Sequence, residues 1–237
     1  IITSTSYLNS FHIKGIIYAK KNKIHCSSIL DDWNEYKKRF TFKKKIILPD
    51  ELIVFNKPAY KIAKSSFPHK KIKLLKDLFL KKILDEIKIY KEIHVIKRRK
   101  KYNFDKILYL SDPIEFNVFS KKERQKYNEK NVINFICKNI YKISKNYKIN
   151  VRMHPSYNSK KNSKKKFFFK NNVKIKISKE KNLLNDIMRH DIILGCETHA
   201  LIPAFYSKKK VFCVIPDYVK KENKLKHLKI RELRKIK

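Results

Sequence analysis

Short apolar runs alternate with amphipathic stretches along most of this 237-residue chain, and this alternation restricts the fold more than any other feature. The second half shows it most regularly. Its apolar runs predict strands at 107–110, 149–153, 173–177, 191–194 and 211–215. Its helical periodicity predicts helices at 131–143, 183–188 and 198–206. Strands that alternate with helices at this spacing favour an α/β fold, in which helices flank a parallel sheet on both faces.

The first half repeats the pattern in shorter pieces. It predicts extended segments at 23–28, 45–47 and 52–55, and helices at 12–19, 58–65 and 73–90. A basic run at 97–101 separates the two halves. We therefore expect two Rossmann-like domains, a partial one at 1–95 and a second at 96–237. The N-terminal domain is expected to be incomplete, because the chain opens on Ile1 without an initiator Met.

The net charge of +39 is the second strong feature. Such a balance suits a polyanion, an anionic membrane surface or a phosphate-bearing substrate. However, Lys far outnumbers Arg and Ile far outnumbers Ala, which is typical of translation from an A+T-rich genome. The charge alone therefore does not select a function. A nucleic-acid-binding module stays open as an alternative, although the basic and aromatic tract at 160–170 is interpreted as a solvated loop.

Several functional classes lack their sequence signatures. The 4 cysteines form no CxxC pair, so no metal site is expected, and their apolar neighbours indicate a reducing compartment. No apolar run approaches the length of a transmembrane helix, and no signal peptide is recognised. The P-loop, GxGxxG, HExxH and GxSxG motifs are missing from the sequence. These observations predict a cytoplasmic protein without a metal or a bound cofactor.

The segment from Gly195 to His199 is the strongest candidate for ligand binding. It follows the strand predicted at 191–194 and leads into a helix expected to start near Thr198. Ligands in open α/β sheets bind beyond the carboxyl ends of strands, and a helix N-terminus there suits a phosphate. Gly195 would let the backbone turn tightly, and Glu197 or Thr198 would contact the diphosphate or ribose of a nucleotide. Alternatively, Thr198 only caps the helix and Glu197 complements its dipole.

Polar residues follow two other predicted strands. Arg152 and His154 lie on one face where the strand at 149–153 ends, and a cation beside an imidazole could bind phosphate or protonate a leaving oxygen. Ser111 follows the strand at 107–110 and could contact the nucleotide or the acceptor. The alternatives are a structural histidine at position 154 and a plain turn at Ser111-Asp112-Pro113.

Asp31 opens a cluster of acidic and aromatic residues that follows the extended segment at 23–28. A carboxylate at a strand end could serve as a general base for an acceptor hydroxyl, and the indole of Trp33 could stack on a sugar face. The alternative is the start of a helix, with Trp33 and Phe40 in the core.

Two sets of motifs resemble glycosyltransferases of the GT-B fold, in particular transferases of bacterial capsule and surface-polysaccharide synthesis. The first set is RMHP at 152–155, followed after a basic linker by LLNDIMRHDIILGCETHALIPAFYSKKKVFCVIPD at 183–217. The second is ILDDWNEYKKRF at 29–40 with PDELIVFNKPAYKIA at 49–63. The order of these motifs is also similar to that in the glycerophosphate transferases that build teichoic-acid-type polymers.

The resemblance implies two Rossmann-like domains and a nucleotide-activated donor, held mainly by the C-terminal domain as a substrate, with no metal required. It implies that Arg152 and His154 face the donor phosphate, and that the turn holding Glu197, Thr198 and His199 binds the nucleotide. Asp31 would lie near the acceptor.

A sugar or polyol phosphate would then pass to a glycan or lipid-linked acceptor, with peripheral contact at the anionic inner face of the membrane. A sugar-nucleotide 2-epimerase shares this architecture and is the third alternative. It would need several carboxylates near the ligand.

Overall fold

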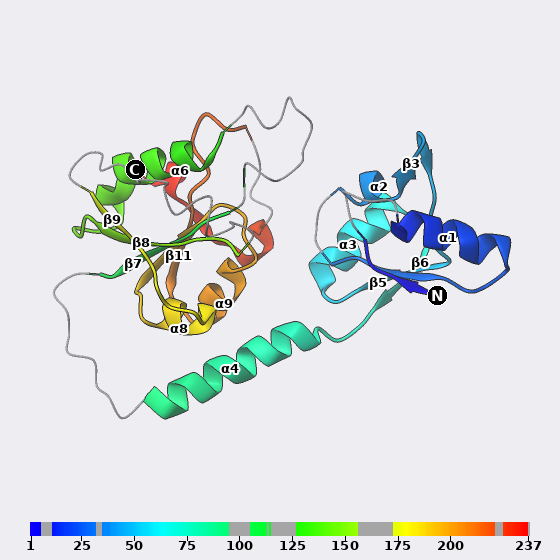
Figure 1. The fold of residues 1–237 in the computed structure, drawn as a ribbon, viewed down its shortest axis with the longest axis horizontal. Coiled ribbons are helices and arrows are strands. Elements are labelled where there is room, and N and C mark those ends of the chain that lie inside the picture. The colour runs from blue at the N-terminus through cyan, green and yellow to red at the C-terminus, as the bar shows by residue number, and fades with distance from the viewer. Residues whose placement is uncertain are drawn as a thin grey trace. The chain divides into compact units, whose positions relative to one another are not determined.

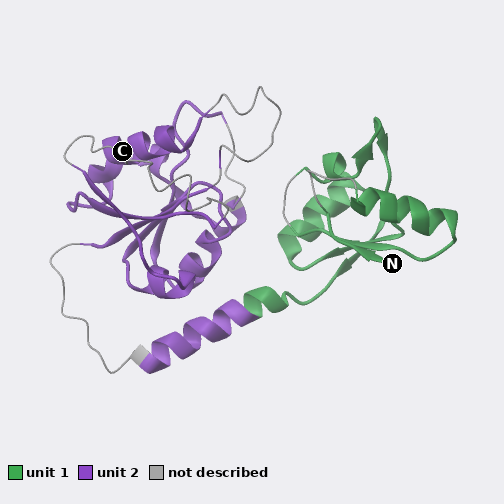
Figure 2. Ribbon diagram, viewed as in Figure 1, with its two compact units in different colours: residues 1–81 green, residues 82–237 purple. Residues whose placement is uncertain are grey.

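The computed structural model describes residues 1–5, 11–31, 35–94, 105–112, 114, 127–155, 173–220 and 225–236. The chain forms two compact units, residues 1–81 and residues 82–237 (Figure 2). Each unit combines a parallel sheet with helices (Figure 1), so the predicted α/β class is confirmed. In the described part of the chain, no helix has the length and apolar character needed to cross a membrane.

Unit 1 is built on a parallel sheet with the strand order β1-β2-β5-β6. These strands are β1 (Ile2–Thr3), β2 (Ser27–Ile29), β5 (Glu51–Val54) and β6 (Lys71–Leu74). Helix α1 (Phe11–Lys21) connects β1 to β2, and helix α3 (Lys57–Ser66) connects β5 to β6. Between β2 and β5, the chain forms the short helix α2 (Tyr36–Arg39) and an antiparallel hairpin of β3 (Thr41–Phe42) and β4 (Lys45–Ile46).

The helices of unit 1 each turn one face toward the core. α1 buries His12, Ile13, Ile16 and Ala19, which recur at helical spacing. α3 buries Ala59 and Ala63 and begins at Asn56, whose side chain accepts a hydrogen bond from the Ala59 N–H at 2.9 Å. The helices predicted at 12–19 and 58–65 are therefore confirmed.

The helix predicted at 73–90 begins later than expected. Helix α4 spans Leu78–His94, and the residues Lys71–Leu74 form strand β6 instead. Asp77 sets the start of α4, because its Oδ1 accepts a hydrogen bond from the Leu80 N–H at 2.8 Å. The segment Lys71-Ile72-Lys73-Leu74 alternates with the period of a strand, and the longer helical periodicity that follows obscures this short signal.

Unit 2 contains a parallel sheet with the strand order β12-β11-β10-β7-β8-β9. Its strands are β7 (Ile107–Leu110), β8 (Lys148–Arg152), β9 (Lys174–Ile177), β10 (Ile192–Gly195), β11 (Lys210–Cys213) and β12 (Arg231–Glu232). Helix α6 (Glu129–Asn139) covers one face, and helices α8 (Leu183–Met188) and α9 (Leu201–Tyr206) cover the other (Figure 1). Single 3-10 turns lie at η1 (Ile140–Lys142), η2 (Lys226–Leu228) and η3 (Leu233–Lys235).

Strands β7 and β10 lie at the centre of this sheet and are buried along their whole length. They are almost entirely apolar because helices cover both faces of a parallel sheet. The sheet begins with β7, and the chain then adds β8 and β9 on one side and β10, β11 and β12 on the other. This is the strand order of doubly wound nucleotide-binding sheets, in which ligands bind beyond the carboxyl ends of the strands where the order reverses. Here those strands are β7 and β10.

Candidate functional site

Two carboxylates follow the adjacent ends of β7 and β10. Leu110, the last residue of β7, pairs in register with Gly195, the last residue of β10. Beyond these ends, the Glu197 N–H donates a hydrogen bond to Asp112 Oδ2 at 3.0 Å. Asp112 is buried and Glu197 is half-buried. The structure thus brings the predicted turn after β10 together with the end of β7, at the point where the strand order reverses.

Ser111 lies beside this pair and binds the neighbouring helix. Its N–H donates to the Arg152 carbonyl oxygen at 2.9 Å, and its hydroxyl donates to Glu129 Oε1 at 2.5 Å. Both Ser111 and Glu129 are buried. Because Glu129 is the first residue of α6, this bond joins the end of β7 to the start of that helix. Ser111 therefore positions α6, and its predicted contact with a nucleotide or an acceptor stays a prediction.

Tyr127 is a residue of this region that the sequence did not point to. Burial raises the pKa of Tyr127 well above its usual value, and the nearby Cys196, Glu197 and Asp112 raise it further. The phenol is therefore protonated at neutral pH and can donate a hydrogen bond. Tyr127 directly precedes Asn128, the N-cap of α6, so the same helix start brings Tyr127 and Glu129 toward the ends of the central strands. No motif or spacing in the sequence signals this arrangement.

The turn after β10 differs from the expected one. Helix α9 begins at Leu201 and not near Thr198, because Pro203 has no N–H and fits only in the first turn of a helix. Thr198 precedes the helix, where its hydroxyl accepts a hydrogen bond from the Ala200 N–H at 3.3 Å.

Gly195 has a packing role at this turn. No glycine of the described chain has a positive φ, so the backbone at Gly195 does not depend on glycine's conformational freedom. A Cβ there would lie 3.0 Å from Leu201 Cδ2 and 3.1 Å from Thr198 Cγ2. The absence of a side chain therefore lets the turn and the start of α9 pack directly on the end of β10.

Arg152 ends β8, and its guanidinium holds the loop between β9 and α8. Its Nη1 donates to the Glu180 carbonyl at 2.6 Å and to Asp186 Oδ2 at 3.0 Å, and its Nη2 donates to the Lys181 carbonyl at 2.7 Å. The Asp186 side chain is only 2% exposed. These bonds give Arg152 a structural function in unit 2, in addition to the phosphate contact predicted from the sequence.

His154 follows β8 at the same edge of the sheet as the turn after β10. The strand order places β8 two positions from β10, which corresponds to about 10 Å across the sheet. Partial burial lowers the pKa of His154, so its imidazole is uncharged at neutral pH. In that form it can donate or accept a hydrogen bond.

His190 completes a buried polar network behind this edge. Its Nδ1 lies 2.6 Å from the Asp186 carbonyl oxygen and must donate to it, so its Nε2 accepts from Asn150 Nδ2 at 2.7 Å. This pattern uses the neutral imidazole. Burial lowers the pKa of His190 and outweighs the opposing influence of Asp186.

The free energy of unfolding should therefore depend on pH near neutrality. A histidine with a lowered pKa binds fewer protons in the folded state than in the unfolded state. Its contribution to the free energy of unfolding is therefore complete above the pKa of the unfolded chain, about 6.5, and is lost as the pH falls below that value. We expect urea midpoints, followed by circular dichroism, to fall between about pH 7 and pH 5.5. His190→Gln should flatten this slope, and adding His154→Gln should flatten it further. An unchanged slope in His190→Gln would contradict the neutral network.

Asp31, the predicted general base in unit 1, lies just after β2. Its Oδ1 accepts a hydrogen bond from Arg39 Nη1 at 2.5 Å, and the Thr5 hydroxyl lies 3.4 Å from the same oxygen. The Arg39 side chain is 4% exposed, whereas that of Asp31 is 61% exposed. Arg39 is itself held through its backbone, since its carbonyl oxygen lies 2.7 Å from His12 Nε2. The alternative of a core position for Phe40 is confirmed, because Phe40 is fully buried.

Some sequence predictions lie outside the described residues. These are Asp32, Trp33, Pro113, the basic run at 97–101 and the tract at 160–170. Within the described ranges, no group of three or more His, Cys, Asp or Glu side chains could hold a metal ion.

No protein-family model matches this chain, and no curated protein matches it. Among solved structures, the chain is similar to UDP-GlcNAc 2-epimerase from Methanocaldococcus jannaschii, with a TM-score of 0.50 and 16% identity. That match covers 90% of this chain and 60% of the epimerase, so the chain spans less than two thirds of the epimerase's length. The chain is also similar to the beta Kdo 2,7 transferase of Thermosulfurimonas dismutans, with a TM-score of 0.34 and 14% identity over 90% of this chain and 78% of the transferase. The first similarity shows the fold, which is a Rossmann-type α/β fold of the GT-B-like kind.

Proposed function

We propose that unit 2 binds the nucleotide part of a sugar-nucleotide donor, at the edge of the sheet where β7 and β10 end. The observation that carries this proposal is the contact between Asp112 and Glu197 at the point where the strand order reverses. In doubly wound sheets this is the position at which nucleotides bind, and carboxylates there accept hydrogen bonds from ribose hydroxyls.

The neighbouring side chains suit the remaining parts of such a ligand. Tyr127 keeps its proton and would donate to a base or sugar oxygen. Thr198 and His199, on the turn after β10, are the members of the predicted set that would meet the diphosphate. His154 would reach the leaving oxygen from the end of β8, and as a neutral imidazole it would donate a hydrogen bond there.

The reaction that fits this ligand is transfer of the sugar, or of a polyol phosphate, to a surface or capsular glycan or its lipid-linked precursor. Asp31 is the candidate base for the acceptor hydroxyl, because Arg39 and Thr5 hold its carboxylate at the end of β2 while most of it stays exposed. No step of this proposal uses a metal or a bound cofactor. A transferase of this kind would work at the cytoplasmic face of the membrane, where such acceptors are anchored.

Binding of uridine, cytidine and guanosine diphosphates to the full chain tests the site. We expect at least one to raise the melting temperature by mass action. Asp112→Asn and Glu197→Gln should each weaken that nucleotide by about tenfold or more in calorimetry, because each removes a charged hydrogen-bond acceptor.

Asp105→Asn provides the matched control for this test. It removes the same charge from the same unit, but Asp105 precedes β7 at the opposite edge of the sheet and pairs with Lys210 at 3.6 Å. The control should bind the nucleotide as the wild type does. Equal affinity in all three variants, or no nucleotide binding at all, would reject the site.

A sugar-nucleotide 2-epimerase is the second candidate, because Asp112, Glu129 and Glu197 gather near one strand end and such an enzyme needs several carboxylates. The products separate the two reactions. With a nucleotide-activated donor and a glycan acceptor, a transferase should release a nucleoside diphosphate when it transfers a sugar and a nucleoside monophosphate when it transfers a polyol phosphate. An epimerase would need no acceptor and would yield an isomer of unchanged mass.

A further inference from the structure

The outer face of α1 is apolar, aromatic and basic. The inner face is buried against the sheet, and the outer one exposes Phe11, Lys14, Ile17, Tyr18 and Lys21. Phe11 is 73% exposed and Tyr18 is 59% exposed. The Lys14 ammonium lies 5.5 Å from the centre of the Phe11 ring. A soluble helix with only a solvated outer face has no need of exposed Phe, Ile and Tyr side chains in one stripe.

The hairpin of β3 and β4 adds a basic tip of similar character. Lys43 and Lys44 form its two-residue turn with φ values of 47° and 65°. Such turns favour Asn and Gly, since a left-handed conformation costs other residues about 1 kcal/mol each. Lys45 and Ile46 follow and are exposed, while the Lys43 ammonium lies 5.7 Å from the Phe42 ring. Lysines thus occupy two positions at which Gly or Asn would be more stable.

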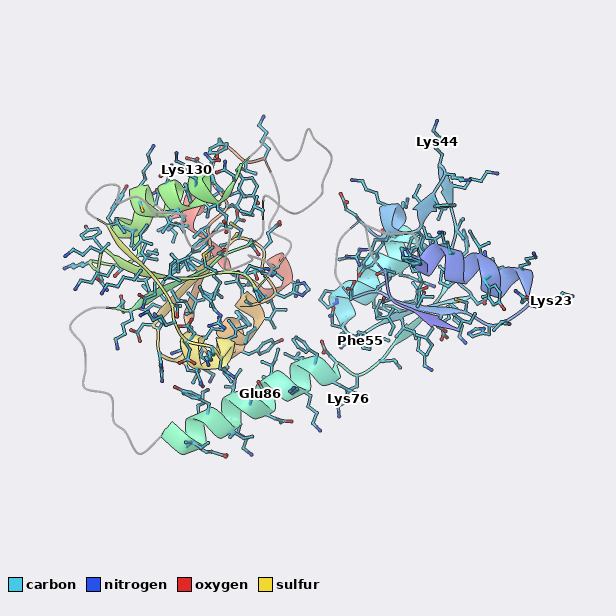
Figure 3. All side chains as sticks on the ribbon, viewed as in Figure 1. Lys23, Lys44, Phe55, Lys76, Glu86 and Lys130 are labelled. Atoms are coloured by element: carbon cyan, nitrogen blue, oxygen red, sulfur yellow. The ribbon has the colours of Figure 1, made fainter. Side chains whose placement is uncertain are left out.

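The base of the hairpin packs against the inner side of the first turn of α1. The His12 ring, in the first turn of α1, lies 6.1 Å from the Phe40 ring and 2.7 Å from the Arg39 carbonyl. Phe40 directly precedes β3 and closes the base of the hairpin by accepting a hydrogen bond from the Ile47 N–H at 2.8 Å. Figure 3 shows Lys44 projecting from the hairpin tip and Lys23 lying just beyond the last residue of α1.

Helix α1 and the β3–β4 hairpin contain lysines and no Asp or Glu. The acidic residues Asp31 and Glu35 lie between them in the chain, before α2. Lysines that flank exposed aromatic and aliphatic side chains are the signature of a surface that lies in the headgroup layer of an anionic bilayer. Nucleic acid would also attract the lysines, but it offers no apolar layer for Ile17 and Ile46.

We infer that the outer face of α1 and the β3–β4 hairpin form a docking surface for anionic lipid headgroups. The lysines contact the headgroups, and Phe11, Ile17 and Ile46 enter the boundary of the acyl chains. This inference names the membrane-facing surface of the protein and is independent of the nucleotide site in unit 2.

Flotation of the full chain with vesicles tests the surface. We expect binding to vesicles of equal parts phosphatidylglycerol and phosphatidylcholine, and little binding to pure phosphatidylcholine. Lys43→Gln with Lys44→Gln should weaken binding by about 30-fold, which corresponds to about 1 kcal/mol per lysine near an anionic surface. Phe11→Ser should weaken it by about tenfold, because a partly inserted ring is lost.

Matched controls separate this surface from the general positive charge of the chain. Lys176→Gln with Lys179→Gln removes the same charge from exposed positions in unit 2, and Tyr141→Ser removes an exposed ring there. Both controls should keep wild-type vesicle binding, and the two unit 1 variants should keep wild-type nucleotide binding.

Three results would overturn the inference. The first is no binding to anionic vesicles, and the second is an equal loss in the Lys176 and Lys179 control. The third is salt-sensitive binding of single-stranded RNA that depends on Lys43 and Lys44 while vesicles do not bind, which would assign the surface to nucleic acid.

Discussion

Arg152→Met is expected to lower the free energy of unfolding of unit 2 by about 3–5 kcal/mol. The guanidinium donates to two backbone carbonyls and to Asp186, whose carboxylate is almost fully buried and also lies 3.6 Å from His190 Nδ1. Met fills much of the volume of Arg but leaves a buried anion without its cation. Removal of one partner of a buried pair is costly for this reason, even where the intact pair adds little. Urea denaturation of the full chain, followed by circular dichroism, measures the change.

Arg189→Met is the matched control. Arg189 follows α8 and pairs at 2.7 Å with Oε2 of Glu180, a residue of the loop that Arg152 also holds. The Arg189 side chain is mostly exposed, so its loss should cost less than about 1 kcal/mol. Similar small losses in both variants would show that Arg152 has no structural function. A structural function predicts that Arg152→Met unfolds at a lower urea concentration but that its folded fraction binds the nucleotide with unchanged affinity. A phosphate contact predicts that the folded fraction itself binds more weakly.

Asp31→Ala is expected to destabilise unit 1 by about 2–3 kcal/mol, because it leaves the buried guanidinium of Arg39 without its anion. The cost is smaller than for Arg152→Met, since water reaches the exposed side of Asp31 and Thr5 still accepts from Arg39 Nη1 at 2.9 Å. A catalytic base with no structural partner would instead change stability by less than about 0.5 kcal/mol. Thermal unfolding monitored by calorimetry distinguishes these outcomes.

Glu35→Gln tests whether any carboxylate in this segment has the same effect. Glu35 is half-buried just before α2 and pairs at 2.6 Å with Lys38, whose side chain is mostly exposed. Its loss should cost less than about 1 kcal/mol. If Glu35→Gln destabilised the chain as much as Asp31→Ala does, the buried position of Arg39 would not be the cause.

The strands and helices were largely predictable, because each depends on residues close together in the chain. The strand at 107–110 and the helix at 183–188 were predicted to the residue, since a buried apolar run and a helical repeat are local signals. The errors occurred where two local signals meet. The alternation of Lys71–Leu74 merges with the periodicity of the following helix, and the apolar run after Thr198 hides the requirement that Pro203 lie in the first turn of α9.

The candidate site was predictable only as a set of strand ends. The sequence placed Ser111, Arg152 and Glu197 after apolar runs, and parallel strands bring such residues to one edge. It gave no signal for Tyr127 or Glu129, which reach that edge from the start of a helix. It also did not reveal that Arg152 bonds Asp186, a partner 34 residues away in the chain that only the fold of unit 2 brings close.

The sequence by itself determined that this chain alternates strands with helices and which residues follow the strands, because hydrophobic periodicity records burial one segment at a time. Only the tertiary structure decided that β10 returns to the free side of β7, and hence that Glu197 meets Asp112. The reason is that the side of the sheet taken by each crossover depends on packing between segments that are distant in the chain, and no local pattern of residues encodes that choice.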